Sequence, residues 1–187
     1  MITEAKIRRH PEREATEHAP EILAAGHVAH VGFIEDGRPF VIPFTYHYDS
    51  EFPHSIFLHG SPGSRAMRTF VQGAAVCVTV TLLDELVYSR DAKYHSMNYR
   101  SVVCFGTARR ATEELKHRLF AHMISRYFPG RTEGRDYEAA TNAQLASTEL
   151  VEIQINEWSA KIRTGGPKGP RDADADASGT CGIAEII

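Results

Sequence analysis

Short segments of β-branched and aromatic residues, separated by turn signals, constrain the fold of this chain more than any other feature. Several of them alternate apolar and polar residues, which is the period of a strand with one buried face. Asp36-Gly37 lies between the first two segments and is typical of a two-residue hairpin turn. The six strand-like segments are residues 27–34, 39–48, 55–60, 74–83 (extended by 85–89), 97–110 and 148–158.

Helix-forming segments are fewer and do not alternate regularly with the strands. We expect a short helix near 11–25 that ends at Gly26, another over 65–73, and a longer one from Thr112 to about Tyr127, stopped by Pro129-Gly130. A helical turn is expected at 141–147. Because there is no regular βαβ alternation, the pattern predicts an α+β, mainly β fold: an antiparallel barrel with peripheral helices.

The chain is long enough, at 187 residues, to bury one core, and we expect a single domain over residues 1–168 with a helical N-terminal segment at 1–26. Residues 169–187 contain the low-complexity run RDADADASG and are expected to form an acidic, flexible tail. The final CGIAEII is apolar enough to dock onto another surface.

Composition argues against several classes of partner. The formal net charge is −3 and no long basic run occurs, so nucleic-acid binding is not expected. No apolar stretch approaches the roughly 18 residues of a membrane-spanning helix. The charged N-terminus is unlike a secretory signal, and the three cysteines form no CxxC motif. These features together predict a cytoplasmic protein.

One turn, HGSPGSR at 59–65, is a candidate anion site. A Gly/Ser turn that leads into a helix places free backbone N–H groups and the Arg65 guanidinium close together. The alternative is an ordinary capped helix in which Ser64 is the N-cap and the arginines are solvated. Both interpretations fit the sequence of this segment.

The remaining polar candidates are single residues. Ser101 lies on the otherwise apolar face of a predicted strand, where a buried hydroxyl needs a partner or a ligand. The ten histidines form no HxH or HExxH spacing, and His117 and His122 are five residues apart, so no metal site is predicted. Haem ligation by a single histidine stays open. No nucleophile motif is present.

Four segments, taken in order, resemble one family. GRPFVIPFTYHYD (37–49), SIFLHGSPGSRAMR (55–68), HSMNYRSVVCFG (95–106) and INEWSAKIRTGGPK (155–168) are similar to the pyridoxamine 5′-phosphate oxidase-like, FMN-binding split-barrel proteins, in the flavin-nucleotide-binding or nitroimidazole-resistance-like branch. The resemblance implies a six-stranded antiparallel split β-barrel. It also implies a homodimer with two FMN molecules in the grooves between the subunits.

The resemblance further implies a set of cofactor-binding residues. The second strand would run beside the isoalloxazine ring, the third strand and the turn after it would bind the ribityl chain and phosphate, and later strands would close the site. The residues implied are Pro43, Phe44 and Thr45, then His59, Gly60, Ser64 and Arg65, then Ser101, Trp158 and Arg163. Ala66 stands where many relatives carry a second cation, and Arg68 could replace it.

The function implied is that of an FMN-dependent oxidoreductase, a reductase or oxidase of a small organic molecule. Tyr99, His59 and His95 are the candidate proton donors, and NAD(P)H is a candidate electron donor that would bind transiently, because no Rossmann fingerprint occurs. The tail is unlike that of the pyridoxamine-phosphate oxidases proper, which argues against vitamin B6 oxidation. Two alternatives are a non-catalytic flavin-binding carrier or sensor and a haem-binding split barrel.

Overall fold

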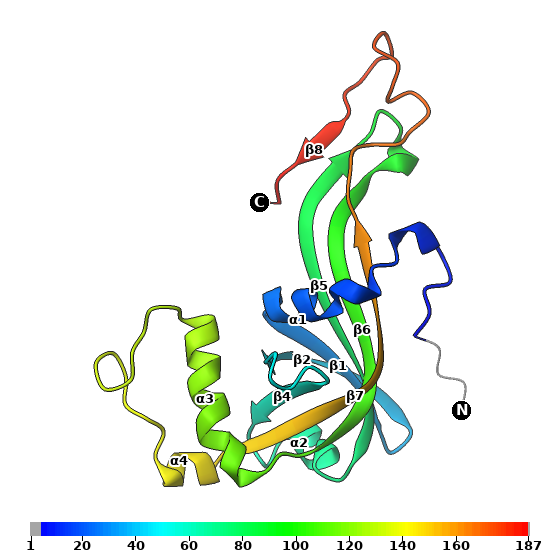
Figure 1. Ribbon diagram of the computed structural model, residues 1–187. Helices are drawn as coiled ribbons and strands as arrows, with labels where there is room; N and C mark the ends of the chain where they lie inside the picture. The colour runs from blue at the N-terminus through cyan, green and yellow to red at the C-terminus, as the bar shows by residue number, and fades with distance from the viewer. Residues whose placement is uncertain (1–4, 187) are drawn as a thin grey trace.

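A computed structural model describes residues 5–186 (Figure 1). The first four residues of the predicted segment 1–26 and Ile187 of the predicted tail lie outside the described residues. One antiparallel sheet runs in the order β2-β1-β5-β6-β7-β4-β3, with β8 paired to β5, and curls into a half-barrel. The strands are β1 (Val28–Glu35), β2 (Arg38–Thr45), β3 (His47–Tyr48), β4 (Ser55–Gly60), β5 (Ala74–Tyr88), β6 (Ser96–Arg110), β7 (Glu149–Arg163) and β8 (Gly182–Ala184).

The predicted fold class, a mainly β antiparallel split barrel with peripheral helices, is confirmed. The six longer strands correspond to the six predicted segments, and the short β3 and β8 bring the number to eight rather than six. The hairpin between β1 and β2 turns at Asp36 and Gly37, whose φ angles of 51° and 74° are the positive values that such a tight turn requires. Alternation along β5 buries Val76, Val78 and Val80 on one face.

An arm extends from the barrel where β5 and β6 continue as a long hairpin, with β7 alongside part of it (Figure 1). We use "the arm" for residues 82–88 of β5 and 96–101 of β6. Their pairing shifts register between Leu83 and Glu85. Three apolar side chains of the arm are about half exposed, namely Leu83 (53%), Leu86 (43%) and Met97 (40%). The arm therefore carries an apolar surface away from the core.

The helices are peripheral, as expected. The N-terminal segment contains two short 3₁₀ helices, η1 (Pro11–Arg13) and η2 (Thr16–His18), followed by α1 (Ala19–Ala25), so the expected helix over 11–25 is broken into three pieces. Pro20 does not end a helix, because it lies in the first turn of α1, where no N–H donor is needed. The others are α2 (Arg65–Phe70), η3 (Ala92–Tyr94), α3 (Glu113–Tyr127) and α4 (Asn142–Ala146).

Two apolar clusters hold these elements together. The main core lies inside the half-barrel, where Ile22 and Leu23 of α1 and Phe70 of α2 pack against the strands. A smaller cluster contains Leu119 of α3 with Phe57 of β4, together with Leu150 and Ala111. This second cluster seats α3 over β4, and that placement forms the site described below.

The segment 169–186, expected to be flexible, lies against the arm (Figure 1). The Asp172 carboxylate accepts hydrogen bonds from the Ser89 hydroxyl (2.9 Å) and from the backbone N–H groups of Arg90 (2.9 Å) and Gly169 (2.6 Å). Beyond it, β8 pairs with residues 86–88 of β5, so the apolar C-terminal stretch docks onto the arm. Among residues 5–186, no helix is long and apolar enough to cross a membrane.

Candidate flavin site

A pocket of about 350 Å³ lies between the end of β2, the end of β4 and the inner face of α3. That volume is within the roughly 300–1,000 Å³ typical of small-molecule sites. Its walls are almost wholly apolar, with two polar side chains contributed by the strands. The lining residues are Thr45, His59, Phe120, Met123, Ile124, Tyr127 and Phe128.

His59 is the polar residue set deepest in this pocket. Its ring packs against Phe120, with 5.2 Å between the ring centroids. The Nδ1 atom is buried and has no hydrogen-bond partner among residues 5–186. Burial lowers the pKa of the imidazole below its usual value, which favours the neutral ring. A buried imidazole nitrogen without a partner is costly, and it indicates that a ligand completes the site.

The three predicted residues of β2 behave differently from one another. β2 is the edge strand of the sheet, which explains how Pro43 is accommodated without a ladder donor. Phe44 faces inward and packs against Phe70 (6.1 Å between centroids), whereas Pro43 and Thr45 are exposed. Of the three, Thr45 lines the pocket with His59.

The predicted phosphate turn has the geometry of a capped helix. The Ser64 hydroxyl accepts a hydrogen bond from the Met67 N–H (3.3 Å), so the capping alternative describes this residue. The Arg65 guanidinium lies 2.7 Å from the Glu35 carboxylate and covers the Phe40 ring at 4.4 Å. Arg65 is half exposed, so its charge is accessible to an anion. Gly60 lies close to Met67, since an added Cβ would be 3.0 Å from its Cε atom.

Arg68, the possible substitute for a second cation, donates a hydrogen bond from its guanidinium to the Gly63 carbonyl oxygen. Its charge is therefore held near the same turn as Arg65. Ala66, by contrast, is buried and supports α2 against the core. The turn thus has two cations beside it, and neither is buried.

The other predicted residues lie toward the far end of β7. Ser101 pairs with Lys161 of β7 and Tyr99 with Arg163, whereas His59 pairs with Leu150. Positions 150 and 161 are about 36 Å apart along a strand that rises 3.3 Å per residue. Within a single chain, Ser101 and His59 therefore lie beside different parts of β7.

Arg163 is buried, and its guanidinium donates hydrogen bonds to the Asn98 side-chain oxygen and to the Gly165 carbonyl oxygen (3.1 Å). These contacts give it a structural role in the arm. Trp158 lies 5.3 Å from His54, centroid to centroid. His95, the remaining candidate proton donor, is exposed at the start of the arm, where its Nδ1 is 3.4 Å from the Asp91 carbonyl oxygen.

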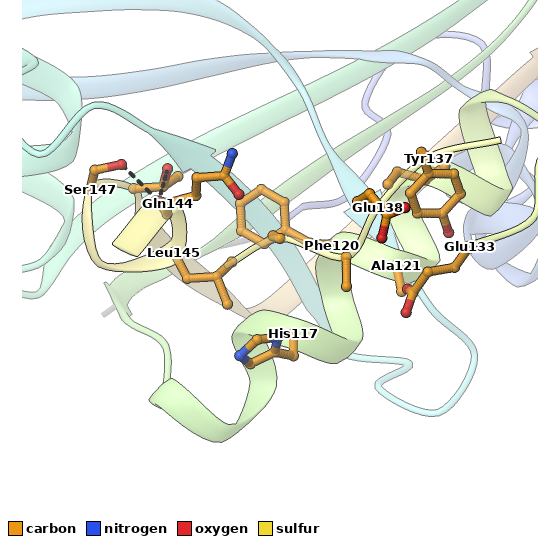
Figure 2. A pocket seen from close by; sticks show the side chains of 13 residues that line it. His117, Phe120, Ala121, Glu133, Tyr137, Glu138, Gln144, Leu145 and Ser147 are labelled. Carbon is orange, nitrogen blue, oxygen red and sulfur yellow. Dashed lines mark hydrogen bonds between the residues drawn. The ribbon is translucent and has the colours of Figure 1, made fainter. Parts of the chain in front are cut away.

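A second pocket, of about 570 Å³, lies beside the first on α3, and Figure 2 shows the residues that line it. Phe120 and Ile124 line both pockets. The outer walls come from α4 and the segment after α3, which contribute polar groups from Glu133, Tyr137 and Gln144. No predicted cofactor residue lines this second pocket.

Sequence reasoning missed the residues of α3 that line the site, namely Phe120, Met123, Ile124 and Tyr127. The helix itself was predicted over the correct residues, and these side chains recur at the three- and four-residue spacing of one helix face. This spacing predicts an apolar helix face that packs against another part of the chain. It does not identify that part as the ends of β2 and β4.

The antiparallel half-barrel with its peripheral helices defines a split-barrel protein, and comparison with known proteins gives the family. The family model described as pyridoxamine 5′-phosphate oxidase matches residues 15–162. The chain belongs to this family. No curated protein matches the chain.

Solved structures show the same fold. The FAD and haem binding protein from Mycobacterium smegmatis is 30% identical with a TM-score of 0.82, over 93% of this chain and 84% of that one. The flavocytochrome Anf3 from Azotobacter vinelandii is 27% identical with a TM-score of 0.83, over 98% and 84%. A candidate 5-nitroimidazole antibiotic resistance protein from Bacteroides thetaiotaomicron, at 18% identity over 79% and 84%, shares the fold with a TM-score of 0.64.

Proposed function

We propose that this chain is a flavin-dependent oxidoreductase that uses FMN to reduce or oxidise a small organic molecule. One observation carries the proposal: Thr45 and His59, which the resemblance to this family implies as cofactor residues, line one apolar pocket. A bound flavin supplies hydride exchange. The protein supplies the binding, the orientation and the electrostatics of the site.

The residues present fit a flavin. Aromatic and aliphatic side chains of α3 suit a flat, apolar ring, and the unpartnered Nδ1 of His59 offers a polar contact at its edge. Arg65 contacts Glu35 and Phe40, toward the other end of β2 from Thr45, and its half-exposed charge would bind the phosphate in place of the Glu35 carboxylate. His59 is the candidate that can hold or release a proton beside this pocket.

We further propose that the site is shared between two copies of the chain in a homodimer. His59 and Ser101 lie far apart along β7, so both contribute to one site only if they come from different protomers. The exposed apolar side chains of the arm, Leu83, Leu86 and Met97, offer a surface for that pairing. Light scattering on purified protein tests the dimer, and a monomer that binds flavin fully would overturn it.

The purified full chain tests the cofactor directly. We expect flavin absorbance bands, about one flavin released per chain on denaturation, and FMN as the nucleotide identified by chromatography. A colourless protein that takes up neither FMN nor FAD in a fluorescence titration would contradict the proposal. Reduction of the bound flavin by NAD(P)H tests the electron donor. A tightly bound flavin that no donor reduces would favour the carrier or sensor alternative.

A haem protein is the second candidate, and the same histidine supports it. A neutral imidazole in an apolar pocket is a common haem ligand, and two similar structures are, by their names, a FAD and haem binding protein and a flavocytochrome. Haem supplied to the protein should then give a Soret band. His59→Ala should remove that band.

A further inference from the structure

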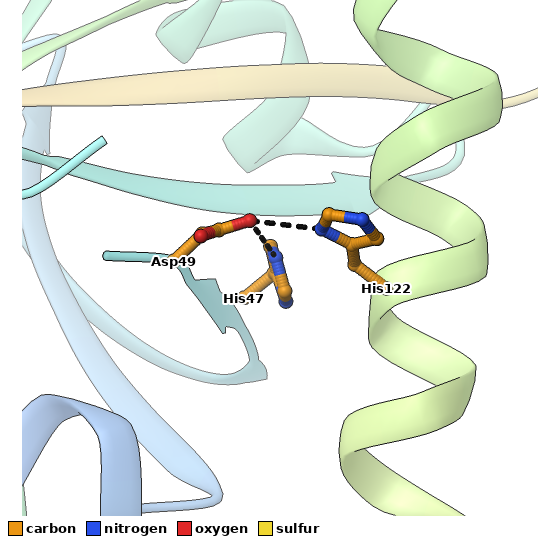
Figure 3. Close-up of side chains that lie close together, drawn as sticks. All are labelled: His47, Asp49 and His122. Atoms are coloured by element: carbon orange, nitrogen blue, oxygen red, sulfur yellow. Dashed lines mark hydrogen bonds and ion pairs between the residues drawn. The ribbon is translucent and has the colours of Figure 1, made fainter. Parts of the chain in front are cut away.

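We propose that His47, Asp49 and His122 form a binding site for one divalent transition-metal ion, of which Zn²⁺ is the type case. His47 lies in β3, Asp49 directly follows that strand, and His122 lies on α3 (Figure 3). The site therefore joins an edge of the sheet to the long helix. It shares no lining residue with the Thr45–His59 pocket.

The three ligand atoms already face one another. The Asp49 Oδ2 atom is 2.8 Å from His122 Nδ1 and 3.7 Å from His47 Nε2. All three atoms lie within 4.8 Å of one another. In a tetrahedral zinc site, with bonds of about 2.0–2.2 Å, neighbouring ligand atoms are about 3.4 Å apart. Small side-chain rotations are enough to bring the three atoms to that spacing around an ion.

His47 provides a second and independent indication of a ligand. Its side chain is 5% exposed, and neither ring nitrogen has a hydrogen-bond partner among residues 5–186. Two buried imidazole nitrogens without partners carry a large desolvation cost, which a metal bond at Nε2 would offset in part. The Nε2 atom is directed at the Asp49 carboxylate, into the middle of the cluster (Figure 3).

An ordinary hydrogen-bonded pair explains only part of this arrangement. The contact between His122 and Asp49 is a complete interaction in its own right. It does not explain why His47 is buried with its Nε2 directed at the same carboxylate at 3.7 Å, which is beyond hydrogen-bond distance. A metal ion in the centre would bind one atom of each of the three side chains at once.

The three ligand side chains, and the hydrogen bond that holds the Asp49 carboxylate in place, fit a transition-metal site. Two imidazoles and one carboxylate are ligands for Zn²⁺ and similar ions. The second oxygen of Asp49 accepts a hydrogen bond from the Glu51 N–H (2.9 Å), which fixes the carboxylate as outer partners do in metal sites.

The cluster opens onto a pocket of about 670 Å³, so three protein ligands leave a coordination position accessible. That arrangement resembles sites in which water or a small molecule completes the metal sphere. Glu21 and Arg126 also line the pocket. A carboxylate and a guanidinium beside the open position would favour a small polar ligand there.

The test uses the full chain without an affinity tag, freed of metal by a chelator. Calorimetric titration with Zn²⁺ should show one site per chain, and Co²⁺ should give the visible absorption of a low-coordinate nitrogen and oxygen site. His122→Gln and Asp49→Asn should each weaken Zn²⁺ binding by more than the roughly 10–100-fold that loss of an outer hydrogen-bond partner costs. Both side chains lie nearer the surface than His47, so these variants keep the core intact.

His117→Gln is the matched control, since His117 lies on the same helix and contacts Asn142 instead. It should bind Zn²⁺ as the wild type does. Circular dichroism verifies that each variant is folded. Absence of a one-to-one site in the wild type, or wild-type affinity in both His122→Gln and Asp49→Asn, would overturn the proposal. The result does not depend on whether flavin is bound.

Discussion

The Tyr127 hydroxyl links the end of α3 to Tyr46, which directly follows β2. It accepts a hydrogen bond from the Tyr46 N–H (3.1 Å) and donates one to the Tyr46 carbonyl oxygen (2.5 Å). Arg126 donates to the same carbonyl oxygen (3.0 Å) and to the carbonyl oxygens of Leu23 and Ala24 at the end of α1. Two adjacent side chains of α3 thus fix the helix over the pocket.

Replacing Tyr127 by Phe should destabilise the protein and loosen this helix. The change leaves the Tyr46 N–H without its partner, which costs about 1–3 kcal/mol of unfolding free energy. Urea denaturation measures the loss. Tyr94→Phe is the control, because Tyr94 is exposed on η3, and its effect should stay within about 0.5 kcal/mol. Equal effects of the two substitutions would show that the Tyr127–Tyr46 contact adds nothing to the unfolding free energy.

Much of the fold follows from local sequence signals. The helix from Thr112 to Tyr127 and the strand 55–60 were predicted at or next to their observed bounds, because periodicity and end signals are local properties. The contacts of the segment 169–186 are not local, because they include the hydrogen bond that the distant Ser89 hydroxyl donates to the Asp172 carboxylate. The composition of the segment predicts how it behaves in isolation. It carries no information about contacts with residues far away in the sequence.

In the candidate sites, too, the sequence predicts relations between neighbouring residues but not contacts between distant ones. His47 and Asp49 are two residues apart, which places them on the same side of an extended segment, but His122 is 73 residues beyond Asp49. No spacing rule connects them, so the sequence predicted no metal site. The resemblance named Thr45 and His59, which line one pocket, together with Ser101 and Arg163, which lie elsewhere in the chain. A list of residues cannot show which of them belong to one copy.

Arg65→Ala tests the phosphate end of the proposed flavin site. Loss of a charge-assisted contact should weaken flavin binding by about 1.5–3 kcal/mol, or roughly 10–100-fold in Kd. The unfolding free energy should change by less than about 1 kcal/mol, because the Arg65–Glu35 pair is half exposed. Fluorescence titration of the flavin-free protein gives the affinity.

Arg38→Ala provides the comparison for Arg65, since Arg38 is also exposed and lies at the start of β2. This variant removes the same charge from the molecule without touching the turn at 60–65. Flavin affinity that is unchanged in Arg65→Ala, or reduced equally in both variants, would count against a phosphate site at Arg65.

Asp172→Ala should release the C-terminal segment from the arm. The carboxylate accepts hydrogen bonds from Ser89, Arg90 and Gly169, and losing a charge-assisted bond of this kind raises local opening of the segment about tenfold. Limited proteolysis should therefore cleave the segment at least ~10-fold faster. Asp174→Ala is the control, because Asp174 is exposed. Wild-type cleavage rates in Asp172→Ala would show that the carboxylate does not hold the segment.

Stability should fall in mild acid because of the buried histidines. Burial lowers the pKa of His59, and it is the main cause that lowers the pKa of His47, relative to the value near 6.5 of an unfolded chain. Below about pH 6.5 the unfolded chain binds protons that the folded chain resists, so the unfolding free energy decreases as pH falls and is fully present above that range.

His59→Gln isolates one of the two contributions, because glutamine does not titrate in this range. Urea unfolding of wild type and variant at about pH 7.5 and 5.5 should show a weaker pH dependence in the variant, by at most about 1.4 kcal/mol per pH unit. The sign is fixed by the lowered pKa: removal of the group can only reduce the loss in acid. An equal or steeper loss in His59→Gln would mean that His59 takes up its proton in the folded protein as readily as in the unfolded chain. In that case burial of Nδ1 in the pocket does not keep the His59 imidazole neutral.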